Sequence, residues 1–222
     1  MIVQSMTPEE VYREIDRDMP DVAAWWLRER KTLERIARAT TWKFPFTRWY
    51  DHTSKRGNRY MVMSTLMGRK YNDENLTCVF ALQKAERGHA VYFTRWPWQV
   101  VANRIVELPH VFDRYADPKR GNVQKTGTEL IKHFVERNAY GEPAGDQRFS
   151  GRSVRYKGRD NLCLCISDGV LLGEELGDIF VAHTFITYDM ARGLQREAFE
   201  KNRDKLLSNE EMQQQIKRIY NI

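Results

Sequence analysis

Two side chains that could act on a phosphodiester stand four residues apart near the middle of the chain. His110 and Arg114 follow Pro109, and they share one face of any helix that begins there. An imidazole can move a proton near neutral pH, and a guanidinium can stabilise the charge that builds on a phosphate. The pair is therefore a candidate acid/base group and phosphate clamp for RNA.

The same spacing occurs a second time, in His133 and Arg137. A pattern that repeats within one chain is not specific, so spacing alone does not select either pair. For each of them the alternative is a surface or capping histidine beside a solvated arginine.

Metal-dependent chemistry has less support in the sequence. The five histidines are scattered, and no His-Glu-x-x-His motif is present. Cys163 and Cys165 stand two apart in an apolar run and lack a third and fourth ligand at zinc-finger spacing, so we expect them to be small buried residues. We therefore predict no metal and no cofactor.

The charge balance favours an encounter with polyanions. The chain has 36 Lys and Arg against 30 Asp and Glu, a formal charge of +6. Aromatic rings can stack on bases while guanidinium groups contact phosphates, which suits single-stranded nucleic acid. Arginines stand beside aromatics in Arg48-Trp49-Tyr50, Arg59-Tyr60, Arg114-Tyr115 and Arg155-Tyr156-Lys157. The alternative for any one pair is a strand with one face in the core and a charged face in water.

The sequence also indicates a compartment. Hydrophobic residues make up 41% of the chain and charged residues 30%, and no apolar run is long enough to span a membrane. The first residues lack a basic region followed by an apolar stretch, so no secretory signal is expected. We expect a cytoplasmic protein without a membrane partner.

The elements that must position these residues follow from periodicity and turn chemistry. Residues 1–40 predict a pair of helices, the first starting at Thr7-Pro8 and the second restarting at Pro20-Asp21. Residues 41–99 read as an antiparallel strand meander, and Pro45 places its first strand at an edge or bulge. The prediction is an α+β protein: a mainly antiparallel sheet flanked by N-terminal and C-terminal helices, in one compact domain.

Residues 100–222 predict two helices, three strands and C-terminal helices. The short helix is His110–Ala116, and the longer one runs from Thr126 or Thr128 to Asn138. We predict a loop at Gly141–Gln147 and a tight turn at Asp168-Gly169. The predicted strands are Ser153–Lys157, Leu162–Ser167 continuing through Val170–Leu172, and a central strand at Ile179–Tyr188.

Over about residues 100–190, this order of elements around the His110 and Arg114 helix resembles the barnase–colicin–RelE-like superfamily of RNase toxins. The resemblance implies His110 as acid/base, Arg114 as phosphate clamp and Thr184 at the catalytic edge of the sheet. It adds charge from Arg155 or Lys157. Members often carry another arginine one turn after the first; here Pro118 stands at that place, flanked by Lys119 and Arg120.

We therefore predict an RNA-binding protein and, in the fuller form of the hypothesis, a metal-independent, toxin-like endoribonuclease. The alternative is an accessory protein that binds nucleic acid or another protein without catalysis.

Overall fold

The computed structural model describes residues 1–39, 44–66, 68–69, 76–94, 104–138, 141–143, 161–192, 196–197, 199–201 and 204. The predicted α+β class, with a mainly antiparallel sheet, is confirmed. Where the sequence predicted one compact domain, the described residues divide into two units. One lies within Met1–Glu86 and Ala90–Arg104, and the other within Arg87–His89 and Ile105–Ile219.

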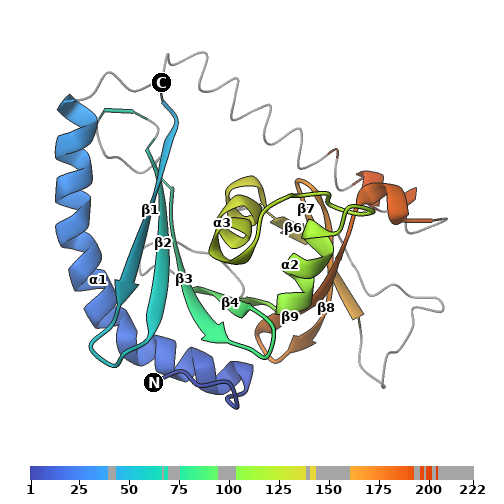
Figure 1. Ribbon diagram of the computed structural model, residues 1–222, viewed down its shortest axis with the longest axis horizontal. Coiled ribbons are helices and arrows are strands. Elements are labelled where there is room, and N and C mark those ends of the chain that lie inside the picture. The colour runs from blue at the N-terminus through green and yellow to red at the C-terminus, as the bar shows by residue number, and fades with distance from the viewer. Residues whose placement is uncertain are drawn as a thin grey trace. The chain divides into compact units, whose positions relative to one another are not determined.

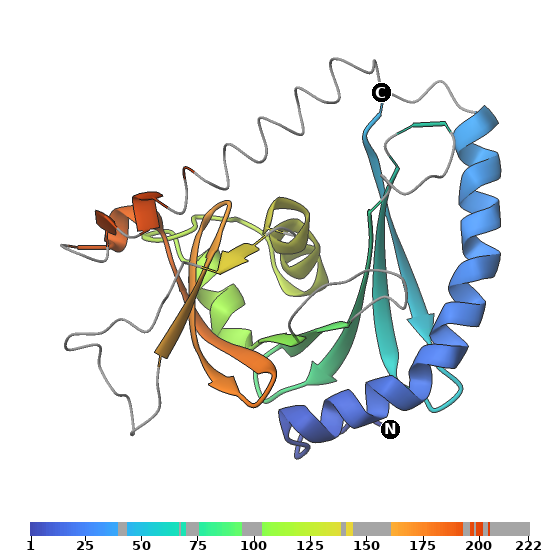
Figure 2. The ribbon, with the colours of Figure 1, turned by 180° about the vertical axis from the view of Figure 1, so that it is seen from behind.

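The first unit begins with one long helix, α1 (Pro8–Ala39), in place of the predicted helical pair. Its start is the expected capping box, in which Glu10 accepts the Thr7 N–H at 2.9 Å. Pro20 lies inside the helix, and the ribbon bends along its length instead of ending (Figure 1, Figure 2). Buried residues on both sides of Pro20, including Ile15 and Trp26, keep one face of α1 in the core and outweigh the lost hydrogen bond.

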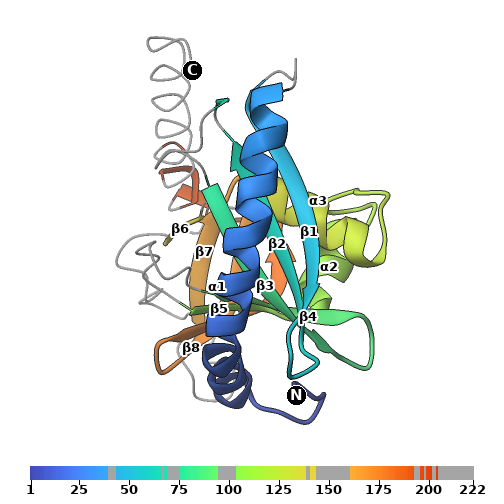
Figure 3. The same cartoon turned by 90° about the vertical axis from the view of Figure 1, so that its left-hand side faces the viewer.

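A meander of strands follows, as predicted: β1 (Phe46–Thr53), β2 (Arg59–Leu66), β3 (Leu76–Lys84) and β4 (His89–Thr94), in that spatial order. β1 starts directly after Pro45 and pairs antiparallel with β2, which pairs antiparallel with β3. The Tyr50 ring meets Trp26 of α1 edge-on at 5.5 Å, and Figure 3 shows α1 lying across these strands. α1 therefore covers one face of the meander.

A buried carboxylate ties α1 to the β1–β2 hairpin. Asp18 is 1% exposed, and its Oδ2 accepts hydrogen bonds from Ser54 at 2.7 Å, Asn58 at 2.6 Å and Tyr60 at 2.9 Å. One turn earlier, a hydrogen bond from Arg56 does most to lower the pKa of Glu14 to about 2. These contacts hold the hairpin to the helix, and we assign them a structural role.

The second unit contains β5 (Arg104–Glu107), α2 (Pro109–Ala116), α3 (Gly127–Asn138), β6 (Gly141–Pro143), β7 (Asn161–Ile166), β8 (Gly169–Leu176), β9 (Ile179–Ile186) and a 3-10 turn, η1 (Tyr188–Met190). The strand order is β5-β9-β8-β7-β6. β9 lies between two other strands, which confirms the prediction of a central strand there. The contacts between β6, β7, β8 and β9 are all antiparallel.

Two parts of this unit differ from the expectation. The predicted continuous strand from Leu162 to Leu172 is two strands, β7 and β8, joined by a turn at Ser167-Asp168. Gly169 follows this turn, and the site has no room for a side chain, because a Cβ there would clash with the Ile186 carbonyl and the Phe185 ring. β6 forms inside the segment predicted as a loop.

Other expectations fall largely outside the described residues. The strand Ser153–Lys157 lies outside them, and so does most of the C-terminal helical segment. Within that segment, the described residues 196–197, 199–201 and 204 are helical.

The sheet of the second unit has a core on each face. On one face, Tyr115 of α2 and Phe134 of α3 meet Phe185 of β9 edge-on. On the other face, Cys163 and Cys165 pack with Phe199. Both thiols are buried, as predicted, and burial raises the pKa of Cys165 to about 11.

Among the helices that the structure describes, none has the length and apolar character needed to cross a membrane.

Candidate nucleic-acid interface

α2 presents one buried and one exposed face. Pro109 occupies the first turn, where its missing N–H costs nothing. Val111, Phe112 and Tyr115 are buried, whereas His110 is exposed and Arg114 is half-buried. The predicted pair therefore lies together on the outer face of the helix.

His110 and Arg114 contact each other directly. Nε of Arg114 donates a hydrogen bond to Nε2 of His110 at 2.9 Å. An imidazole nitrogen that accepts a hydrogen bond carries no proton, so His110 in this arrangement is neutral and holds its proton on Nδ1. What remains for a ligand is the Nδ1–H of His110 and the other N–H groups of Arg114. The pair offers donors only.

The turn after α2 brings more positive charge to the same place. Around the carboxylate of Asp117, Arg114 Nη1 lies at 3.9 Å and Arg120 Nε at 3.7 Å. The backbone N–H of Lys119 donates to Asp117 Oδ1 at 2.9 Å, and the Lys119 side chain is exposed. Three cationic residues thus gather about one carboxylate; Asp113 is a further exposed acid on α2. We call His110, Arg114, Lys119 and Arg120 the α2 surface.

Thr184 does not join the α2 surface. Its neighbour Phe185 points toward α2, with the two rings of Phe185 and Tyr115 at 5.3 Å. Successive residues of a strand point to opposite faces, so Thr184 points away from α2. It stands opposite Leu172 of β8, which packs against the cysteine side of the sheet.

Arg155 and Lys157, the other predicted binding residues, lie outside the described residues.

The aromatic partners of several arginines are committed to the core. Tyr60 and Tyr115 are each 1% exposed, and their hydroxyls donate to Asp18 and Asp168. Trp49 packs on Phe80, with their rings at 5.9 Å. These pairs therefore fit the alternative reading of the sequence, in which the aromatic ring faces the core and the arginine faces water. The buried rings of Tyr60 and Tyr115 are therefore not platforms for stacked bases, whereas Trp49 is half-buried.

The second His-x-x-x-Arg pair has another arrangement, which the sequence did not predict. Arg137 donates from Nε to Asp168 Oδ2 at 2.7 Å, and its Nη2 donates to the other oxygen. Tyr115 also donates to Asp168 Oδ2, at 2.5 Å, and the backbone N–H of Asp168 donates to Asn138 at 2.9 Å. We call Tyr115, Arg137, Asn138 and Asp168 the Asp168 cluster.

The electrostatics of this cluster follow from its hydrogen bonds. Burial acts to raise the pKa of Asp168, but hydrogen bonds from Arg137 and Tyr115 outweigh it and hold the pKa below its ordinary value. Burial, followed by the charges of Lys125 and Arg137, lowers the pKa of His133. Asp168 is therefore ionised and His133 neutral at pH 7. The turn predicted at Asp168-Gly169 lies one residue earlier, at Ser167-Asp168, and its contact with α3 spans 31 residues of sequence.

A second buried carboxyl stands just before α2. Glu107 is 2% exposed, and burial raises its pKa well above the ordinary value. Its Oε2 has no hydrogen-bond partner among the residues that the structure describes. Because Glu107 is enclosed, it adds no charge to the α2 surface.

Within the described part of the chain, no group of three or more His, Cys, Asp or Glu side chains could hold a metal ion. Comparison with protein-family models, with curated proteins and with solved structures finds no match to the chain.

Proposed function

We propose that the protein binds RNA through the phosphates of its backbone, at the α2 surface. The observation that carries the proposal is the hydrogen bond from Arg114 to His110, which leaves both side chains presenting only donors. Phosphate oxygens are acceptors only, so a face of donors beside two further cations suits them. The overall charge of +6 favours the same class of partner.

The mode of binding follows from what the surface lacks. The tyrosines beside Arg59 and Arg114 are buried, so base stacking has little support at these positions. Contacts to phosphates fix position but carry no sequence information. We therefore expect binding that depends on salt and depends little on base sequence. The choice of RNA over other polyanions rests on the resemblance of residues 100–190 to RNase toxins.

The test is the affinity for a labelled single-stranded RNA, measured by fluorescence anisotropy over a series of salt concentrations. Each phosphate neutralised adds about 0.7 to the slope of log affinity against log salt. Arg114→Ala should lower that slope by about 0.7 to 1.4, since a guanidinium can meet one or two phosphates. An absence of binding at low salt, or an unchanged slope in Arg114→Ala, would overturn the proposal.

His133→Ala is the control for a change at the α2 surface. His133 has the same spacing from Arg137 that His110 has from Arg114, but it lies on α3, so this change should leave the salt slope unchanged. Arg137→Ala does not serve, because it removes the partner of Asp168.

A second candidate function is metal-independent cleavage of RNA by His110. It is favoured by the contact of the imidazole with a cation that could bind phosphate. In that contact Nε2 is occupied, so His110 becomes a base only if Arg114 turns onto a phosphate and frees Nε2. Thr184 has no part in this version, because it points to the other face of the sheet.

The test is RNA incubated with the protein in EDTA. Cleavage by the unmutated protein that falls by about 10²- to 10⁴-fold in His110→Ala would support catalysis. If the RNA stays intact, the protein does not cleave it, and the proposal of binding alone remains.

A further inference from the structure

The C-terminal half of α1 carries a row of exposed cations. Arg28, Lys31, Arg35 and Arg38 are all exposed, and their spacing of three, four and three residues places them along one side of the helix. We call these four residues the α1 stripe. A helix rises about 1.5 Å per residue, so the stripe extends over about 15 Å.

The two halves of α1 differ in how many of their cations are paired with carboxylates. In the first half, Arg13 pairs with Glu10 at 4.0 Å and Arg17 pairs with Glu14 at 2.6 Å. In the second half, Arg30 pairs with Glu34 at 3.2 Å, and Arg38 lies 3.8 Å from the same carboxylate. No ion pair joins Arg28, Lys31 or Arg35 to another residue that the structure describes. The stripe therefore holds more positive charge than its neighbourhood balances.

The helix dipole does not account for the whole stripe. Cations near the C-terminus of a helix are stabilising, but the effect falls off within the last turn. This explains Arg38 and, in part, Arg35. Arg28 and Lys31 lie 11 and 8 residues before Ala39, the last residue of α1, so the helix dipole does not stabilise their charge.

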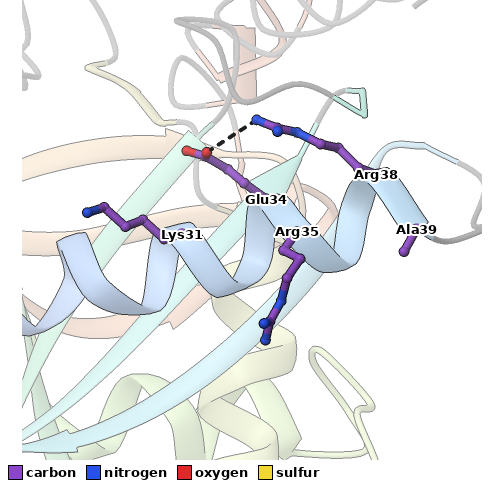
Figure 4. Close-up of a pocket in the computed structure, with 5 residues that line it drawn as sticks. All are labelled: Lys31, Glu34, Arg35, Arg38 and Ala39. Carbon is purple, nitrogen blue, oxygen red and sulfur yellow. Dashed lines mark ion pairs between the residues drawn. The ribbon is translucent and has the colours of Figure 1, made fainter.

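The stripe borders a hollow in the surface. The hollow has a volume of about 290 Å³ and is lined by Lys31, Glu34, Arg35, Arg38 and Ala39. Figure 4 shows Lys31 on the same side of α1 as the Glu34–Arg38 ion pair, while Arg35 points to another side of the helix. A compact anion seated in this hollow would meet the cations of Lys31 and Arg38, while Glu34 is already paired with Arg30 at 3.2 Å.

We propose that the α1 stripe is a second phosphate-binding surface for RNA, separate from the α2 surface. This inference rests on the proposed function, since it names a further contact of the same ligand. Cations one turn apart along a rigid helix can follow a run of phosphates, and such contacts depend on charge and not on base identity.

The test compares two double variants in the anisotropy assay with single-stranded RNA. Lys31→Ala/Arg35→Ala removes two cations of the stripe and should lower the log–log salt slope by about 1.4. Arg13→Ala/Arg17→Ala removes two exposed arginines with the same spacing in the same helix, but these are already paired with carboxylates. It should leave the slope nearly unchanged. Circular dichroism establishes that both variants are folded.

The outcomes separate the two proposals. If Arg114→Ala lowers the slope and Lys31→Ala/Arg35→Ala does not, the stripe is overturned while the α2 surface stands. If both double variants lower the slope equally, general charge is responsible, and the stripe is again overturned. Loss in the stripe variant alone, with Arg114→Ala unchanged, supports the stripe and contradicts the α2 surface. Equal competition by polyglutamate and RNA for the stripe would point to an acidic protein partner and overturn the RNA assignment.

Discussion

The two His-x-x-x-Arg pairs have the same spacing and opposite arrangements. On α2, Arg114 donates to its own histidine, and its nearest carboxylate contact, with Asp117, is 3.9 Å long. On α3, Arg137 turns to Asp168 with two hydrogen bonds. The difference is one acidic residue of the β7–β8 turn, Asp168, which pairs with Arg137 and not with Arg114. An identical local pattern can thus hold a fold together or remain exposed to a ligand.

The comparison assigns stability to the Asp168 cluster and binding to the α2 surface. Among the variants considered, Asp168→Ala should have the largest effect on stability. This change removes the charge-assisted bonds of Arg137 and leaves the buried Tyr115 hydroxyl without its acceptor. Bonds to charged groups contribute about 1.5–3 kcal/mol each, and the exposure of Arg137 reduces its share. We expect the free energy of unfolding to fall by about 3 kcal/mol in urea titrations. A loss below about 1 kcal/mol would refute the structural role.

Glu107 is a buried carboxyl that, unlike Asp168, has no arginine or tyrosine partner among the described residues. The pKa of Glu107 is raised in the folded protein, so the unfolded chain loses its proton above the ordinary value of 4.5 while the folded chain retains it. Stability should therefore fall as pH rises above 4.5. Glu107→Met removes a buried acceptor and should raise the free energy of unfolding at pH 8 by about 1–2 kcal/mol, with a smaller gain at pH 4.5. Urea titrations at both pH values measure this, and a gain that is equal at both would contradict the burial argument.

Tyr115→Phe tests one bond of the Asp168 cluster at a time. The ring keeps its packing on Phe134 and Phe185, but the hydroxyl that donates to Asp168 is gone. We expect a loss of about 1 kcal/mol from thermal unfolding. In the background of Asp168→Ala the same change should cost less, because the bond is already absent. Equal costs in both backgrounds would show that the hydroxyl and the carboxylate act independently.

Features that depend on neighbouring residues could be predicted from the sequence, whereas contacts between distant residues could not. The bounds of β2 and of the short helix α2 follow from local periodicity and turn residues. So does the adjacency of His110 and Arg114, since four residues make one helical turn. Pro20-Asp21 predicts the start of a second helix, but burial on both sides of Pro20 keeps α1 continuous.

The contacts that distinguish a structural arginine from an exposed one join residues that are far apart in the sequence. Arg137 and Asp168 are 31 residues apart, and no local signal joins them. The orientation of Thr184 follows from the packing of its neighbour Phe185 on Tyr115 of α2, which is another contact between distant parts of the sequence. Order along the chain therefore suggested a shared site for His110 and Thr184, whereas the pleat of β9 separates them.

The smallest expected effect completes the comparison. His110→Ala/Arg114→Ala removes two side chains on the outer face of α2, so the free energy of unfolding should change by no more than about 0.5 kcal/mol. Urea titration beside Asp168→Ala measures both on one scale. A loss as large as that of Asp168→Ala would mean that the α2 surface is structural after all.

The most direct test of the central claim is the state of the His110 ring, followed by ¹⁵N NMR in histidine-labelled protein during a titration with single-stranded RNA. The account predicts a neutral His110 with its proton on Nδ1 in the unbound protein. RNA should shift the His110 resonances and leave those of His133 nearly unchanged. A His110 protonated on Nε2 before RNA is added, or equal shifts at His110 and His133, would contradict it.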